Sequence, residues 1–421
     1  MRVLFLSSWY PFPAKNGSEL RILNLLAALA ERHEVTLLAL REMEGRDSGG
    51  EPIPGVRVRT VPRRPYRPGS LRALSGLVRP VPRSLVDTYV PALGGLIREE
   101  LAGAEYDLVI ASEMGMSAYH PMFVDMPSIF EDVELGIYRS QGEQATNFLS
   151  RWRHVLSWIK LGAYLRRVVP RFSASTVVSQ EERNHLEGIL RHGHRIEIVP
   201  NGIRLRDYED VETKEGDVPT LIYTGAMSYI ANFDAMCWFV AKIFPVIKQA
   251  IPSARLLITG NPGERSLPRH DGVELTGQVA DIRPLVASAD VSVVPLRLGG
   301  GTRLKVLEAM ALGTAVVSTR KGAEGLAVAA NTHLLVEDAP RAFAEAVVRL
   351  LREKGLRREL TANARRLVAE KYDWPVILPT FVHLAEEVAG TRSTRSPNRR
   401  LAFGGGISGD GPTFAKRPAM D

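Results

Sequence analysis

A segment of ten residues carries the side chains best suited to bind a phosphorylated ligand. It reads Gly299-Gly300-Gly301-Thr302-Arg303-Leu304-Lys305-Val306-Leu307-Glu308. Glycines allow backbone N–H groups to approach an anion closely, and a helix that begins behind them adds a dipole of favourable sign. Arg303 and Lys305 fall in the first turn of that helix, where cations are unfavourable unless an anion compensates them. The pattern therefore indicates a site for a phosphate or diphosphate group.

Glu308 lies on the same helix among apolar residues, so we expect it to be buried. A buried carboxylate needs hydrogen-bond donors, and the paired hydroxyls of a ribose ring supply two. The alternative is a Lys305–Glu308 pair at i, i+3 on a solvated helix, beside a glycine-rich loop without function. We favour the ligand site, because the glycines, cations and carboxylate suit one ligand better than they suit one another.

The elements that must position this segment alternate between strand and helix. In the first half of the chain the predicted strands are Val3 to Leu6, Val35 to Leu40, Val56 to Val61, Asp107 to Ala111 and Ser128 to Phe130, and a helix begins near Ser18. In the second half they are Leu221 to Thr224, Arg255 to Thr259, Val273 to Leu275, Asp290 to Val294 and Ala315 to Thr319, with a helix from Asn232 to Ala250. Such alternation predicts two α/β domains with parallel sheets and crossover helices.

Shifts in composition suggest where these domains begin and end. We expect a first Rossmann-like domain at residues 1–203, a polar hinge at 204–218, a second Rossmann-like domain at 219–375, a C-terminal helix at 376–390 that packs back toward the first domain, and a disordered tail at 391–421.

The overall composition is that of an ordinary globular protein, with 421 residues of which 45% are hydrophobic and 24% are charged. The single cysteine, Cys237, cannot form an internal disulfide, so we expect a cytoplasmic protein. The apolar start from Met1 to Leu6 is too short for a signal peptide, and no uninterrupted apolar run approaches the roughly 18 to 20 residues that cross a bilayer. The net charge of +7 favours polyanionic partners such as nucleotides or phospholipid surfaces. Nothing in the pattern supports recognition of nucleic acid.

The segment from Gly299 to Glu308 resembles the donor-binding motif of retaining glycosyltransferases of the GT4 kind, which have the two-domain GT-B fold. Further similarities are spread over residues 1 to 390. They are Pro11 to Gly17, Ser173 to Glu182, Ile198 to Ile203, Tyr223 to Met227, Leu275 to Val279 and Asp290 to Pro295. The resemblance implies an α/β protein in which two Rossmann-like domains face each other across a donor and acceptor cleft.

The resemblance also implies a chemistry. A nucleotide sugar would be the donor, held mainly by the second domain, and the acceptor on the first domain would be a sugar, a lipid-linked molecule or another small molecule. Transfer would retain the anomeric configuration without a protein nucleophile, a cofactor or a required metal, and the leaving diphosphate would help to deprotonate the acceptor. Preorganised cations would then be the main catalytic contribution, which makes Arg303 and Lys305 the expected catalytic residues. The expected donor-binding residues are Asn16, Gly17, Gly225, Gly260, Gln278, Val279, Gly299, Gly300, Gly301, Thr302, Arg303, Lys305 and Glu308.

Two departures from the family pattern concern the donor. The family's paired glutamates would require a glutamate at position 300, where this chain has Gly300, so the contacts to the donor sugar stay open. The arginine and lysine that usually follow the opening glycine of the second domain are replaced by the stretch from Met227 to Asn232. We therefore infer that Arg303 and Lys305 neutralise the phosphates, as in a branch of the family with Gly-Gly-Gly-Thr-Arg-x-Lys.

Carboxylates follow two predicted strands of the first domain. Glu113, Asp132 and Glu134 come directly after strand ends, where they would face the crevice of an open sheet. They could orient an acceptor hydroxyl, Glu113 and Asp132 being the candidates for a catalytic role, or simply cap helices. A metal site is not expected at 132–134, because the same acidic pattern recurs in the hinge at 210–212.

Two basic segments suggest contact with an anionic membrane, which would make the protein peripheral at the inner membrane face. Residues 149–163 form one apolar helical stripe with interspersed arginines, which either lies on a membrane or packs on the first sheet. Between Glu51 and Asp87 the chain has many arginines and no acidic residue, so it is either a membrane-binding arm or a solvated loop.

Two other functions remain open, and the missing first glutamate of the pair is the reason for the first of them. One is a catalytically silent partner subunit that binds a nucleotide sugar. The other is a GT-B sugar-nucleotide epimerase, which would convert the donor with no acceptor present.

Overall fold

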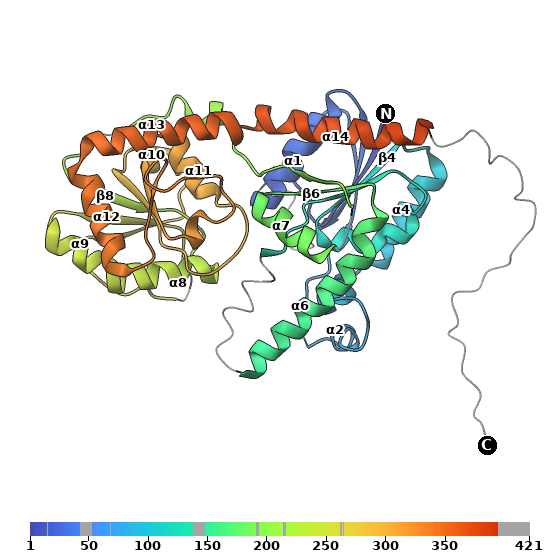
Figure 1. The fold of residues 1–421 in the computed structure, drawn as a ribbon, viewed down its shortest axis with the longest axis horizontal. Coiled ribbons are helices and arrows are strands. Elements are labelled where there is room, and N and C mark those ends of the chain that lie inside the picture. The colour runs from blue at the N-terminus through green and yellow to red at the C-terminus, as the bar shows by residue number, and fades with distance from the viewer. Residues whose placement is uncertain are drawn as a thin grey trace, which may run out of the picture.

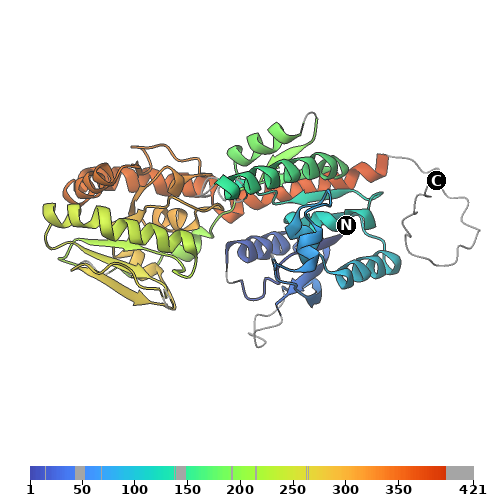
Figure 2. The same cartoon turned by 90° about the horizontal axis from the view of Figure 1, so that it is seen from below.

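The computed structural model describes residues 1–14, 16–42, 53–67, 69–136, 138, 148–190, 193–213, 216–261, 263 and 265–394. Over this part of the chain two α/β domains lie side by side, and the last helices run along one side of both (Figures 1 and 2).

Each domain is built on a sheet of parallel strands. The strands are β1 (Arg2–Ser7), β2 (Glu34–Arg41), β3 (Val56–Pro62), β4 (Leu108–Ser112), β5 (Ser128–Glu131), β6 (Ala174–Val177), β7 (Ile196–Ile198), β8 (Thr220–Tyr223), β9 (Arg255–Thr259), β10 (Val273–Gly277), β11 (Val291–Val294), β12 (Ala315–Ser318) and β13 (Leu335–Val336). Their order is β3-β2-β1-β4-β5-β6-β7 in the first domain and β10-β9-β8-β11-β12-β13 in the second. The predicted class, two parallel-sheet α/β domains, is confirmed.

Helices connect these strands and cover the sheets. In the first domain they are α1 (Gly17–Ala30), α2 (Leu71–Ser75), α3 (Arg83–Thr88), α4 (Pro91–Gly103), η1 (Met114–Met122), α6 (Phe148–Val168), η2 (Val169–Arg171) and α7 (Gln180–Ile189). After the crossing to the second domain they are η3 (Leu205–Tyr208), α8 (Ile230–Trp238), the π-helical turn η4 (Phe239–Ile243), α9 (Phe244–Ala250), α10 (Arg283–Ala287), α11 (Leu304–Ala311), η5 (Lys321–Ala323), α12 (Pro340–Arg352), α13 (Lys354–Lys371) and α14 (Trp374–Thr394).

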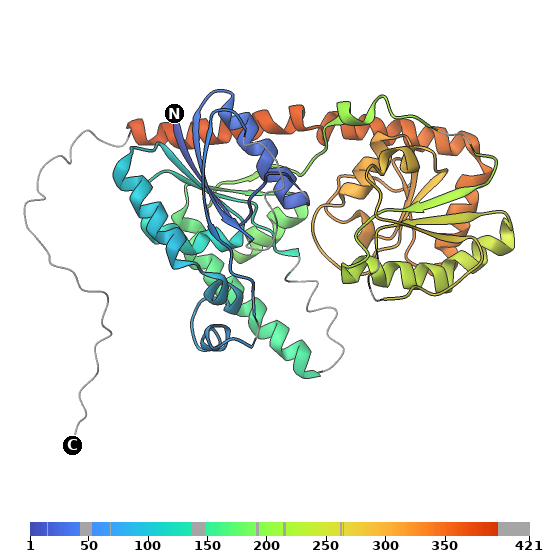
Figure 3. The same cartoon turned by 180° about the vertical axis from the view of Figure 1, so that it is seen from behind.

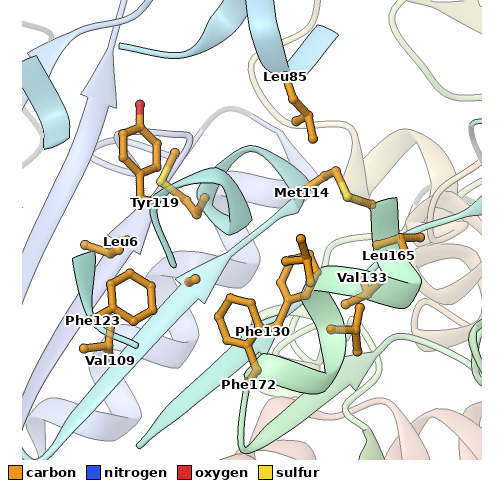
Figure 4. Packing of buried hydrophobic residues seen from close by; sticks show 14 of the residues in the cluster. Leu6, Leu85, Val109, Met114, Tyr119, Phe123, Phe130, Val133, Leu165 and Phe172 are labelled. Atoms are coloured by element: carbon orange, nitrogen blue, oxygen red, sulfur yellow. The ribbon is translucent and has the colours of Figure 1, made fainter. Parts of the chain in front are cut away.

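Both faces of the first sheet are buried, as strand β1 illustrates. Leu4 and Leu6 point into one apolar cluster, whereas Val3 and Phe5 point into the cluster on the opposite face. Figure 4 shows the first of these clusters, in which the ring of Phe130 stacks on that of Phe172 with centroids 5.1 Å apart. Because helices cover both faces, the carboxyl ends of the strands are the part of the sheet that remains open to a ligand.

The C-terminal helix α14 completes the core of the first domain. Trp374, Ile377 and Phe381 are buried in the cluster that also holds α1. Figures 1 and 3 show α13 on the second domain and α14 on the first, one after the other. Helix α14 ends at Thr394 and so includes the first four residues of the predicted tail; residues 395–421 lie outside the described part of the chain.

The chain crosses between the domains twice, and the two crossings are hydrogen-bonded to each other. The N–H of Ile203 donates to the carbonyl of Tyr372 at 2.9 Å, and that of Trp374 donates to the carbonyl of Ile203 at 3.0 Å. The N–H of Leu205 donates to the Asp373 carboxylate at 3.0 Å. Helix η3, at the start of the predicted hinge, packs on the second domain.

Helices α8 and α9 form one continuous rod through the turn η4. The rod from Ile230 to Ala250 has 21 residues. Its most apolar stretch, 18 residues long, has a mean hydropathy of 1.5, so among the described residues this is the helix long and apolar enough to cross a bilayer. Half of it is buried, and Phe239, Ile243 and Phe244 lie fully inside the second domain. We interpret the rod as a core helix.

The basic segment between Glu51 and Asp87 includes a strand and two short helices among its described residues. It begins with β3, where Arg57 and Arg59 both pair with Glu100 of α4, Arg59 at 2.7 Å. Helices α2 and α3 occupy much of the rest.

Candidate active site

The glycine-bearing loops of the second domain meet at the carboxyl ends of its strands. Gly225, Gly260 and Gly299 follow β8, β9 and β11 with φ angles of 151°, 91° and 94°. A Cβ atom at Gly260 would lie 2.4 Å from the carbonyl oxygen of Gly225, and the Gly260 N–H donates to the carbonyl of Gly277 at 2.8 Å. Backbone groups therefore form this edge, and a side chain at Gly260 would displace them.

Arg303 holds the glycine loop that precedes α11. Its guanidinium donates two hydrogen bonds of 3.0 Å, to the carbonyls of Gly299 and Gly300, and lies 3.4 Å from the Glu324 carboxylate. Only 5% of the residue is exposed, and burial lowers the pKa of the guanidinium, an effect that Glu324 opposes. Its Nε has no hydrogen-bond partner among the described residues. A buried, partly neutralised cation of this kind is well prepared for an anionic ligand.

Lys305 extends from the first turn of α11 to the loop after β8. Its Nζ donates to the hydroxyl of Tyr223 at 2.9 Å and to Oδ1 of Asn232 at 3.1 Å. A Cβ atom at Gly225 would lie 2.9 Å from this Nζ. Burial, together with the charge of Arg303, lowers the pKa of Lys305 to about 7. The ammonium group therefore lies directly beside the backbone of Gly225, where a side chain would not fit.

The residues predicted to bind the nucleoside lie on both sides of this cationic centre. The hydroxyl of Tyr208 donates to Glu308 Oε1 at 3.3 Å. Burial raises the pKa of Glu308, and the Tyr208 hydrogen bond and the charge of Lys305 partly offset this rise. Gln278 is exposed and Val279 half-buried in the loop after β10. Their roles at ribose and base stay predictions.

Asn16 caps helix α1, and Gly17 is the first residue of that helix. The Asn16 side chain accepts a hydrogen bond from the N–H of Glu19 at 3.0 Å and thereby caps the helix. At Gly17 a Cβ atom would lie 3.3 Å from Cδ1 of Leu304 in the second domain. Gly17 therefore faces the start of α11 across the domain boundary.

A cavity of about 100 Å³ separates the glycine loop from the first domain. It is lined by Gly300, Gly301, Thr302, Lys321, Glu324 and Gly325 from the second domain and by Glu134, Gly136, Val178, Ser179, Glu181, Glu182 and His185 from the first. The two domains thus share one site.

Carboxylates end two neighbouring strands on the first-domain side. Glu113 follows β4 and Asp132 follows β5, with φ angles of 69° and 56°, a left-handed conformation that is uncommon outside glycine and concentrated at functional sites. The indole N–H of Trp9 donates to Glu113 at 2.7 Å. Burial, followed by the charge of Asp132, raises the pKa of Glu113 to about 8. Burial also raises the pKa of Asp132, although Arg21 opposes it.

Glu134 lies between the glycine loop and the strand ends of the first domain. A Cβ atom at Gly301 would lie 3.4 Å from Glu134 Oε1, which is buried and has no hydrogen-bond partner among the described residues. Burial, and then the charges of Asp132 and Glu182, raises the pKa of Glu134. A buried acceptor atom without a partner is costly and indicates a group that a ligand completes.

A second cavity, of about 320 Å³, opens on the other side of Glu134. Its lining includes Ser8, Trp9, Ser18, Arg63, Arg64, Glu113, Asp132, Glu134, Tyr138 and, from α3, Ser84, Leu85 and Thr88. Glu134 thus borders both cavities.

A chain of hydrogen bonds connects the first sheet to the glycine loop. Ser112 and Arg21 donate to the two oxygens of Glu131, at 2.5 and 2.6 Å. Arg21 also donates to Oδ1 of Asn201 at 2.9 Å, and Asn201 Nδ2 donates to the hydroxyl of Thr302 at 2.7 Å. Arg21 and Glu131 are almost completely buried. This relay fixes the loop relative to the first domain.

Several of these partners could not be located from the sequence. Tyr223 and Asn232, which hold Lys305, were part of motifs without an assigned role, and Glu324 carried no signal. Arg21 did carry one, because a charged residue among apolar neighbours on a helix face needs a buried partner.

The described residues contain no group of three or more histidine, cysteine, aspartate or glutamate side chains arranged to hold a metal ion. Among the histidines near these elements, His185 borders the first cavity, His194 contacts Ser175, and His192 lies outside the described residues. Metal independence stays a prediction.

Comparison with known proteins identifies the fold. Residues 218–353 match the family described as glycosyl transferases group 1. Among solved structures, sucrose-phosphate synthase from Thermosynechococcus elongatus is 18% identical with a TM-score of 0.69, covering 93% of this chain and all of that one. HepE of Anabaena, in complex with UDP-glucose, is 15% identical with a TM-score of 0.58, covering 94% of this chain and all of that one. The fold is GT-B, as expected.

Curated relatives match over shorter stretches. The phosphatidyl-myo-inositol mannosyltransferase of Mycolicibacterium smegmatis is 29% identical over 205 residues, which are 46% of this chain and 52% of the relative. The enzyme of the same name from Mycobacterium leprae is 32% identical over 165 residues, 35% of this chain and 42% of the relative. The chain thus spans about half the length of the curated relatives that it matches, or less.

Proposed function

We propose that this protein is a glycosyltransferase of the GT4 kind that transfers a sugar from a nucleoside diphosphate to an acceptor hydroxyl, with retention and without a required metal. The observation that carries the proposal is the position of two buried cations, Arg303 and Lys305, behind backbone loops that face carboxylates of the first domain. This arrangement suits a diphosphate on one side and a polyhydroxylated acceptor on the other.

The donor side is suited to a leaving group that gains negative charge. When the bond between the anomeric carbon and the diphosphate oxygen breaks, charge develops on the diphosphate, and cations already in place stabilise it without reorganisation. Arg303 is fixed by two carbonyls and Lys305 by two side chains, so both are preorganised. The leaving diphosphate oxygen then takes the proton of the acceptor hydroxyl as that hydroxyl attacks from the same face.

The acceptor side offers hydrogen-bond partners and a cavity of suitable size. Glu134 borders this cavity and the donor loop, and its raised pKa means that part of the population carries a proton near neutral pH. Glu113 and Asp132 lie deeper in the same cavity. We propose that Glu134 orients the acceptor hydroxyl and that the other two bind neighbouring hydroxyls.

The names of similar proteins support the class of ligand. HepE has been solved with UDP and UDP-glucose, and the curated relatives include phosphatidyl-myo-inositol mannosyltransferases. These names support a nucleotide sugar as donor and are compatible with a lipid-linked acceptor. The base and the sugar are left to experiment.

Two functions are alternatives. A silent nucleotide-binding subunit is one, because Gly300 replaces the first glutamate of the paired motif, and a sugar-nucleotide epimerase of the GT-B fold is the other. A silent subunit would bind the donor and neither transfer nor hydrolyse it. An epimerase would convert the donor when no acceptor is present.

The proposal is tested by a binding screen followed by turnover. UDP, GDP, ADP and TDP are titrated against the full chain, and the sugar donors of the base that binds are assayed for hydrolysis and for transfer to sugars and lipid-linked acceptors. Arg303→Ala and Lys305→Ala should each lower transfer at least about 100-fold while the protein stays folded. Lys242→Ala and Arg341→Ala remove exposed cations of the same domain and serve as controls. Turnover by the first two variants at the level of the controls would refute the assigned roles.

A further inference from the structure

Helix α2 and the turn that follows it expose large apolar side chains. The exposed fraction is 86% for Leu71, 45% for Leu74, 59% for Leu77 and 89% for Val78. Four such residues within eight positions are unusual on a soluble surface, where exposed apolar residues are normally scattered.

The N-terminal half of α6 has the same character. Trp152, Val155, Leu156 and Ile159 are between 49% and 59% exposed, whereas Leu165, further along the helix, is completely buried in the core of the first domain. The exposed residues of the apolar stripe predicted at residues 149–163 therefore do not pack on the first sheet. The second half of the helix is the part that packs into the core of the first domain.

These two elements form one surface. The ammonium group of Lys160 on α6 donates to the carbonyls of Gly76 and Leu77, directly after α2. Figures 1 and 3 show α2 beside α6, with both projecting from the same end of the first domain. We refer to the exposed residues of α2, its following turn and the first half of α6 as the α2–α6 surface.

The α2–α6 surface is also strongly basic. Helix α6 contains no aspartate or glutamate over its whole length, and the sequence from residue 52 to residue 86 contains none either. Basic residues of these elements are Arg72 on α2, Arg79 in the turn after it, and Arg153 and Lys160 on α6; Arg64 and Arg67 precede α2 in the chain. Asp87, the nearest acid along the chain, is completely buried and accepts hydrogen bonds from the backbone of Arg67 and from Ser70.

We propose that the α2–α6 surface docks on an anionic lipid bilayer. Apolar side chains surrounded by arginines match the boundary between acyl chains and phosphate headgroups, where the arginines reach the phosphates while the leucines and tryptophan insert. A second copy of this chain is a poorer occupant, because two surfaces of the same positive sign would face each other. Nucleic acid would use the charge and leave the apolar side chains without a partner.

The location of the surface suits the reaction proposed above. Helix α3 packs on α2, and its residues Ser84, Leu85 and Thr88 line the second cavity. A bilayer on the α2–α6 surface would therefore lie next to the proposed acceptor cavity, so an acceptor with a lipid anchor could enter from the membrane. This link to a lipid-linked acceptor rests on the proposed function, whereas the docking does not.

The test uses the full chain and sedimentation with vesicles of phosphatidylcholine alone or with about one third phosphatidylglycerol. Binding is expected only to the anionic vesicles and should weaken as salt is raised. Leu71→Glu/Val78→Glu should reduce the partition coefficient at least about tenfold, and Arg72→Gln/Arg79→Gln roughly 20-fold. The matched control Val124→Glu/Val376→Glu introduces the same charge at exposed valines outside the surface.

Circular dichroism and thermal melts establish that each variant is folded, and nucleotide binding reports on the second domain independently. Equal partition of the surface variants and the control would overturn the proposal, since the basic tail beyond residue 394 is common to all of them. A change in oligomeric state, measured by light scattering, without a change in vesicle binding would also overturn it and identify a self-association face. Loss of vesicle binding with nucleotide binding intact would support docking whether or not sugar transfer is observed.

Discussion

The lowered pKa of Lys305 makes a quantitative prediction about donor binding. Without a donor, burial and the charge of Arg303 hold the pKa of Lys305 at about 7, so its amine is about half charged near neutral pH. A diphosphate beside Nζ favours the charged form, so binding above pH 7 requires uptake of a proton. The affinity should be nearly constant below pH 7 and fall up to tenfold for each unit above it. Between pH 6.5 and 8.5 the loss is roughly 25-fold, or about 1.9 kcal/mol.

Isothermal titration of the nucleotide sugar tests this prediction, because the phosphates of the intact donor do not titrate in this range. Repeating the titration in two buffers of different ionisation enthalpy gives the number of protons taken up, which should approach one at pH 8.5. Lys305→Arg keeps a permanent charge, and Lys305→Ala has none to titrate, so both should show a flat pH profile, the alanine variant at lower affinity.

The sign of the accompanying stability effect provides a check without any ligand. The folded-state pKa of Lys305 lies below its unfolded value, so the unfolded chain binds more protons between about pH 7 and pH 10.5. The contribution of Lys305 to the free energy of unfolding should therefore rise across that window and vanish in Lys305→Ala. A wild-type donor affinity independent of pH, or an equal slope in Lys305→Arg, would refute the reasoning.

Three further predictions concern the first domain and its contact with the loop. Glu134→Gln should reduce transfer about 10- to 100-fold while donor affinity changes less than about twofold, because Glu134 Oε1 faces the loop without a hydrogen-bond partner among the described residues. Steady-state kinetics measure the transfer rate, and donor titrations measure the affinity. In a double-mutant cycle, the effects of Asn201→Ala and Thr302→Val on kcat/KM should show a coupling energy of about 1 kcal/mol, because the two side chains share a hydrogen bond of 2.7 Å. Additive effects would show that this hydrogen bond is not maintained in solution. Glu113→Gln should become more stable relative to the wild type as pH rises from about 4.5 to 8, because the raised pKa of Glu113 makes ionisation of the native carboxyl costly. Thermal melts of both proteins at matched pH values test this, and a stability difference that does not change with pH would contradict it.

The fold was predictable because its signal is local and repeated. Apolar runs such as Leu4 to Leu6 alternate with helical stripes, and a strand buried on both faces must be apolar throughout. Glycines at strand ends likewise marked the loops after β8, β9 and β11, where their positive φ angles are required.

The partners of the site residues could not be predicted in this way. Lys305 contacts Tyr223 and Asn232, more than 70 positions earlier in the chain, and Arg21 contacts Glu131, 110 positions later. Such pairs depend on how strands are ordered in the sheet, and neither periodicity nor composition encodes that order.

The apolar stripe of α6 shows a second limit to what the sequence can predict. A helix with one apolar face needs a cover, but the pattern does not say whether protein or lipid provides it. The structure shows which part of the stripe the protein covers: Leu165 lies in the core, whereas Leu156, within three helical turns of it, is exposed.

The double crossing between the domains has a consequence for how the chain folds during synthesis. The first domain needs Trp374, Ile377 and Phe381 to cover one face of its sheet, yet these residues are translated only after the whole second domain. At ribosomal rates that interval is roughly 10 to 35 s, during which α14 does not yet cover this apolar face of the first sheet. The second domain can fold first, and α14 then packs on the first domain once it has emerged from the ribosome. A nascent chain stalled before residue 374 should therefore depend on a chaperone at that face, even though all the strands of its first sheet have already left the ribosome.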